Sequence, residues 1–139
     1  MKLRRMGDTW VVLVERGEDV VASLQKAAAE ARVTAAQVSA IGALEWVELG
    51  LYYLESRTYQ RRRMEGPLEI ASLQGSVSLI AGKPVLHAHT VLSDAKMQAF
   101  GGHLFAGEVG PSCEAFLRVL PGTLEKVDDP PTGLKLWRF

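Results

Sequence analysis

The sequence contains a single cysteine, Cys113, so no disulfide bond can form within its 139 residues. The lack of internal disulfide bonds is typical of proteins in reducing compartments. The first residues are basic but lack the apolar run of a secretory signal, and no stretch approaches the roughly 18 apolar residues of a membrane-spanning helix. These absences predict a cytoplasmic protein without a membrane segment.

The sequence also lacks an excess of charge of either sign. Sixteen Lys and Arg residues balance sixteen Asp and Glu residues, so no overall field draws the protein to nucleic acid or to an anionic membrane. The hydrophobic share of 47% and the charged share of 23% are those of an ordinary globular domain. A chain of this length is expected to form one domain over residues 1–139, with a core at about 10–121 and a C-terminal tail at 122–139.

The pattern of apolar residues predicts one helix among many strands. Residues 18–32 have apolar side chains at helical spacing, with Glu18 and Asp19 in the first turn, where negative charge suits the helix dipole. Most other segments are rich in β-branched residues or alternate apolar and polar residues, as strands do. Gly75 indicates a bulge or a close approach of two strands. The predicted strands cover residues 10–14, a segment with Val38 and Ile41, and residues 46–53, 59–64, 68–80, 85–92, 99–105 and 113–120.

Two segments are expected to be irregular. Residues 107–111, which contain two glycines and a proline, are predicted to form a loop. The tail is expected to lie over the surface and to dock Leu134, Leu136 or Trp137 against the body. One helix among antiparallel strands defines the α+β class.

All three histidines fall in one short part of the sequence, in His87-Ala88-His89 and Gly101-Gly102-His103. Residues two apart on a strand point to the same face, so His87 and His89 are expected to lie side by side. A hairpin with its turn near Lys96 places His103 about opposite His89, where Cβ atoms are about 4.5–5.5 Å apart. The three imidazoles are therefore predicted to converge, and the two glycines leave room for a ligand or a close backbone.

Three neutral imidazoles suit zinc or a similar divalent ion, and three protein ligands leave a fourth position open for water or an anion. The alternative interpretation is that the histidines are hydrogen-bonded structural residues. It stays open because a slip of one residue in register turns His103 to the other face.

Three further candidates are less specific. Cys113 could be a fourth ligand, but its apolar neighbours favour burial in the core. Glu114, on the opposite face of that strand, is a candidate for proton transfer, with a solvated carboxylate as the alternative. Arg61, Arg62 and Arg63 could contact phosphates of a nucleic acid. The alternative is an edge strand protected by charge, and it is favoured because alternate arginines face opposite ways.

Several segments together resemble the PPC (plants and prokaryotes conserved) domain family. They are Ile41-Gly42-Ala43-Leu44, the segment EGPLEIASLQGS at residues 65–76, and the two histidine motifs. The resemblance covers residues 10–121 and implies a strongly bent antiparallel sheet, one helix packed on it and a homotrimer. It also implies that His87, His89 and His103 hold a metal ion, zinc above all.

The resemblance leaves the function open between classes. In plants the PPC domain accompanies AT-hook motifs in nuclear DNA-binding proteins, and bacterial single-domain members are described as DNA-binding by extension; this sequence has no Arg-Gly-Arg-Pro hook. The leading hypothesis is a homotrimeric DNA-binding or regulatory module with a three-histidine zinc site. The alternative is a zinc-dependent enzyme that uses a metal-bound water. Apolar residues on both faces of the sheet support self-association, because one helix covers only one face.

Overall fold

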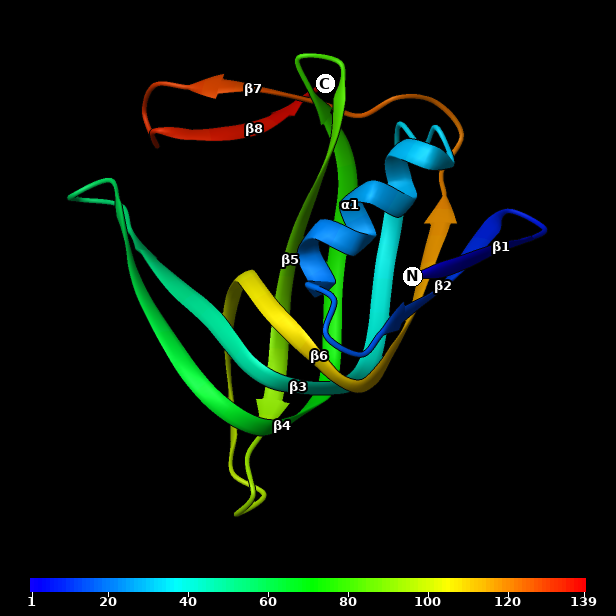
Figure 1. Ribbon diagram of the computed structural model, residues 1–139. Coiled ribbons are helices and arrows are strands. Elements are labelled where there is room, and N and C mark those ends of the chain that lie inside the picture. Colours follow the sequence, from blue (N-terminus) through cyan, green and yellow to red (C-terminus); the bar gives the residue numbers. More distant parts are fainter.

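The computed structural model describes all 139 residues and is an α+β fold dominated by one antiparallel sheet (Figure 1). Its single helix is α1 (Val20–Glu30). The strands are β1 (Lys2–Met6), β2 (Thr9–Glu15), β3 (Ala36–Tyr53), β4 (Thr58–Ile80), β5 (Lys83–Ser93), β6 (Ala99–Val119), β7 (Glu125–Asp129) and β8 (Leu134–Arg138).

The four long strands form a bent sheet that closes on itself. β6 pairs with β3, β3 with β4 and β4 with β5, and β5 pairs in turn with β6. Register shifts in β3 after Ala40 and after Leu44 bend the strand, since a bulge adds a local kink. The far halves of β3 and β4 extend together as an arm that ends at Tyr53 and Thr58 (Figure 1). β6 pairs with β3 along this arm as far as Gly50, so only the tip of the arm is two-stranded.

Each predicted strand overlaps a strand of the structure. In β3, β4 and β6, however, two predicted strands are parts of one long strand. The predicted loop at residues 107–111 is wrong, because β6 continues through it and pairs there with β3. Gly107 lies opposite Val47 and Val109 lies opposite Leu44. The glycines and the proline mark a bend in the strand. The backbone N–H and C=O groups of the bend are satisfied by pairing with β3.

The helix is shorter than predicted because its start is fixed by a cap. Asp19 is the N-cap residue, and its carboxylate accepts a hydrogen bond from the N–H of Ala22 at 2.8 Å. The other carboxylate oxygen accepts from the N–H of Gly107 at 2.9 Å, which ties the helix to the bend of β6. Glu18 therefore lies before the helix. No helix of the structure is long and apolar enough to cross a membrane.

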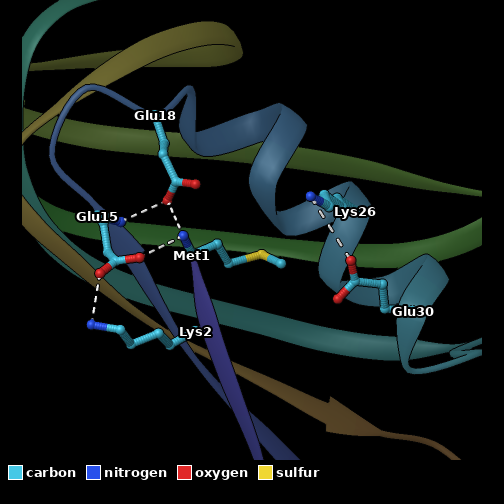
Figure 2. A network of polar contacts seen from close by, with 6 residues as sticks. All are labelled: Met1, Lys2, Glu15, Glu18, Lys26 and Glu30. Carbon is cyan, nitrogen blue, oxygen red and sulfur yellow. Dashed lines mark hydrogen bonds and ion pairs between the residues drawn. The ribbon is translucent and has the colours of Figure 1, made fainter.

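A small ionic cluster joins the N-terminus to the start of the helix (Figure 2). The amino group of Met1 lies 2.8 Å from Glu15 and 2.6 Å from Glu18, and the Lys2 ammonium lies 2.7 Å from Glu15. Hydrogen bonds from Lys2 and from the amino group lower the pKa of Glu15 to about 2. The sequence did not predict β1, because its residues are mostly charged; they suit the exposed edge of the sheet.

The core lies between α1 and the sheet. The helix buries Val20, Ser23, Leu24, Ala27 and Ala28, which are spaced as one face of a helix. Across from them, alternate residues of the strands contribute their apolar side chains to a cluster of 25 buried residues. Gly75 of β4 confirms the predicted close approach: a Cβ atom there would lie 2.5 Å from the carbonyl oxygen of His87.

Candidate metal centre

Strands β5 and β6 bring the three histidines to one point. His89 lies directly opposite His103 in the antiparallel pair, and His87 follows two residues away on the same face. The ring centroids of the three imidazoles are 5.1 to 5.3 Å apart. The register on which the predicted convergence depends is therefore confirmed.

The donor atoms fit a divalent metal ion. One ring nitrogen from each histidine lies within 4.8 Å of the other two, whereas nitrogens about 2.0–2.1 Å from a tetrahedral zinc would lie about 3.4 Å apart. The imidazoles would have to turn toward one another to close that difference. The Nδ1 atom of His103 is buried and has no hydrogen-bond partner. Most buried polar atoms have a hydrogen-bond partner, and a metal ion would supply one to this nitrogen.

The surroundings of the site keep two of the three histidines uncharged. Burial lowers the pKa of His87 to about 4, and the charges of Lys126 and His89 add to the effect. Burial lowers the pKa of His103 to about 4 as well, again with the neighbouring histidines contributing. Both rings are therefore neutral at neutral pH, which is the form in which imidazole binds a metal.

The histidines line a cavity of about 870 Å³ between the arm of β3 and β4 and the hairpin of β7 and β8. Gly50, Tyr52 and Tyr59 come from the arm, and the ring of Tyr59 lies 5.1 Å from that of His103. Gly102 lies beside the histidines in the lining, as expected for a residue that leaves room. The remaining walls are mostly apolar. They comprise Leu51, Ile80, Val85, Leu86, Leu134, Leu136, Trp137 and Phe139.

The hairpin of β7 and β8 projects from the body on the side of the arm (Figure 1), and residues of both strands line the cavity. At one end Glu125 pairs with Leu79 of β4, and the N–H of Leu79 donates to the carbonyl of Leu124 at 2.8 Å. At the other end the hydroxyl of Tyr52 donates to the carbonyl of Thr132 at 2.6 Å. The tail thus lies over the surface as predicted, but as two strands that were not predicted. Its attachments are made by Leu124, Glu125 and Thr132, whereas Leu136 and Trp137, two of the residues expected to dock, stay 42% and 44% exposed.

Lys126 of β7 reaches the histidines themselves. Its Nζ atom lies 3.2 Å from Nδ1 of His87, and burial lowers the pKa of the ammonium. Sequence reasoning missed Lys126 together with Tyr52 and Tyr59. The turn sequence Asp-Pro-Pro-Thr-Gly between two short strand-like segments indicates a hairpin. It does not indicate which part of the fold the hairpin packs against.

Two other candidates lie away from the cavity. Cys113 is buried in the core, where desolvation raises the pKa of its thiol to about 11. Glu114 is exposed on β6, opposite Ile41 and Leu13 and eleven residues along the strand from His103. Neither residue lines the cavity, so the structure does not bring them to the histidines.

The three arginines lie on the arm, where β4 pairs only with β3. They therefore occupy an edge. Arg61 and Arg63 stack on aromatic rings and pair with carboxylates, whereas Arg62 faces the other way. The contacts are Arg61 with the ring of Phe105 at 3.7 Å and with Glu48 at 3.8 Å, and Arg63 with the ring of Trp46 at 3.9 Å and with Glu65 at 2.8 Å.

Comparisons with solved structures show close similarity over almost the whole chain. A metal-containing protein from Archaeoglobus fulgidus is 35% identical, with a TM-score of 0.88, over 97% of this chain and 96% of that one. A plant- and prokaryote-conserved (PPC) protein from Pyrococcus horikoshii is 31% identical, with a TM-score of 0.88, over 99% and 94%. A protein from Ralstonia eutropha, described as a "putative DNA-binding protein", is 26% identical, with a TM-score of 0.92, over 99% and 96%.

Sequence comparison with family models agrees with these structures. No curated protein matches the chain significantly. The model of the Plants and Prokaryotes Conserved (PCC) domain, the family written PPC above, matches residues 1–121. The matched residues include the ring of strands and all three histidines, but not the hairpin of β7 and β8. The chain belongs to the Plants and Prokaryotes Conserved domain family.

Proposed function

We propose that this chain is a metal-dependent protein that binds a small molecule at a zinc ion held by His87, His89 and His103. One observation carries the proposal: three imidazoles from two paired strands converge in the wall of a cavity large enough for a small molecule. The description of the Archaeoglobus protein, 35% identical, as metal-containing supports it.

Zinc would supply a Lewis acid with one open coordination position. The chain's own residues would shape what reaches it. Most of the cavity wall is apolar, and the ring of Tyr59 packs beside His103. A catalytic role for the site would need a proton donor inside the cavity. Glu114 does not meet that need, because it lies outside the lining.

Metal content is the direct test. The purified chain is expected to hold about one zinc per subunit, measured by elemental analysis after incubation with zinc and removal of excess. The His87→Ala, His89→Ala, His103→Ala variant is expected to hold none, because its only converging donor set is gone. Glu114→Gln is the matched control and should keep its zinc. A wild-type chain that stays free of metal would overturn the proposal.

DNA binding is a second candidate, favoured by the description of the Ralstonia protein. Arg61 and Arg63 are already engaged by rings and carboxylates, so Arg62 is the arginine with the most freedom to reach a phosphate. We expect little binding to a duplex at 50 mM salt, measured by fluorescence anisotropy. Tight binding that weakens steeply at 200 mM salt and is lost when the three arginines become alanine would establish this function instead.

We also propose that the chain forms a homotrimer. Ile41, Phe116 and Val91 are large apolar side chains on the face of the sheet opposite α1, and 57%, 46% and 45% of their surfaces are exposed. Ile41 and Phe116 line a shallow hollow there, a surface that self-association would bury. Sedimentation equilibrium is expected to give three times the chain mass of 15.2 kDa. A mass equal to that of one chain would contradict the proposal.

A further inference from the structure

The cavity at the histidines has basic side chains and no acidic ones. Lys126 and Lys135 line it with the three histidines, and no Asp or Glu belongs to the lining. Lys135 is paired with Asp128. Lys126 has no carboxylate partner, and its hydrogen bond is to the Nδ1 atom of His87. Lys126 is therefore the cation of the cavity whose charge is free to meet a ligand.

Metal binding at His87 takes this hydrogen bond away from Lys126. An ammonium group is only a donor, so Nδ1 of His87 must accept with the single lone pair of a neutral imidazole. A metal at Nδ1 takes up that lone pair. A metal at Nε2 moves the ring proton to Nδ1, which then cannot accept. In either case Lys126 loses its acceptor, and a partly buried ammonium without a partner beside a divalent ion is costly.

An anionic ligand would remove this cost. A carboxylate can accept from Lys126 through one oxygen and occupy the open metal position with the other. The rest of the cavity is lined mostly by apolar and aromatic side chains, among them Tyr52 and Tyr59 of the arm and Trp137 of β8. Such walls suit an apolar group on the same ligand better than an inorganic anion.

We propose that the cavity binds an organic carboxylate with an apolar or aromatic group, and that Lys126 determines the specificity for the acid. The inference rests on the proposed zinc site and names the class of its ligand. Lys126 and Trp137 of β8 lie beyond residues 1–121, the part that matches the family model. The ligand class therefore depends on the tail of this chain.

Calorimetric titration of the zinc-loaded protein at pH 7 tests the proposal with two probe pairs. The acids are phenylacetate and hexanoate, and each is compared with its uncharged amide. We expect at least one acid to bind about tenfold or more tightly than its amide, the effect of one hydrogen bond between charged groups. Lys126→Met should reduce that preference, because only the contact of the carboxylate with zinc then favours the acid, and Lys126→Arg should keep most of it. The matched control Lys96→Met changes an exposed lysine of the β5–β6 turn and should change nothing.

Zinc affinity without any carboxylate gives a second readout. Lys126→Met is expected to bind zinc at least as tightly as the wild type, because a competitor for His87 and a repelling charge are gone. Weaker zinc binding by this variant would overturn the role given to Lys126. Equal binding of acids and amides by a zinc-loaded wild type would overturn the ligand class alone. A wild type that takes up no zinc would overturn the proposed function, and the ligand class with it.

Discussion

Zinc is expected to stabilise the metal-free protein by about 2.7 kcal/mol when free zinc reaches a hundred times its dissociation constant. The reason is the placement of the ligands on β5 and β6. His89 and His103 face each other only when the two strands are paired, so the unfolded chain does not present the three nitrogens together. For a domain of this length the midpoint of thermal unfolding should rise by on the order of 10 °C, measured by differential scanning calorimetry.

Two controls separate a specific site from general effects of the ion. A chelator should return the midpoint to that of the metal-free protein, and magnesium at the same concentration should leave it unchanged, because magnesium prefers oxygen ligands. The variant with all three histidines changed to alanine should not respond to zinc. A rise of the same size in that variant would show that zinc binds elsewhere.

The second large effect is expected from Gly75→Ala, which should lower the free energy of unfolding by roughly 1–3 kcal/mol. Gly75 of β4 lies opposite Ala88 of β5, next to the strand segment that holds His87 and His89. A Cβ atom at this position would lie 2.5 Å from the carbonyl oxygen of His87 and 3.0 Å from Cα of Ala88. Both contacts are with backbone, so the strands themselves must move apart. Chemical denaturation measures the loss.

Gly110→Ala is the matched control because it makes the same change in another strand of the sheet. A Cβ atom there would meet a side-chain oxygen of Glu45 at 3.3 Å and its nearest backbone atom at 3.6 Å. A flexible side chain can give way, so the change should stay within about 0.5 kcal/mol. Equal losses in both variants would show that the close approach at Gly75 is not the cause. Gly75→Ala should also weaken zinc binding, since it displaces the backbone of His87.

The histidine geometry could be predicted because it depends on local rules. The alternation of side chains sets the face of His87 and His89, and the turn near Lys96 sets the partner of His103. The helix was predicted for the same reason, although it starts later than predicted, because Asp19 is its N-cap residue. Features within one element or one hairpin were thus readable from the sequence.

The rest of the site depends on contacts between distant segments. The loop prediction at residues 107–111 was wrong because pairing with β3 keeps this glycine-rich segment extended. The hairpin of β7 and β8 is placed by a pairing to Leu79 and by the hydroxyl of Tyr52. No pattern within residues 122–139 contains that information. Lys126 can therefore be assigned to the site only from the folded structure.

The ring formed by β3, β4, β5 and β6 has a consequence for how this protein can change. An edge strand of an open sheet can slip past its single neighbour, whereas a slip of β5 must break its pairing with β4 and with β6 at once. Intermediate arrangements of the histidines are therefore scarce. We therefore expect all three histidines to be kept together while the sequence of the core changes. The C-terminal hairpin is attached only at its ends, so its sequence can diverge and change which ligands the cavity accepts.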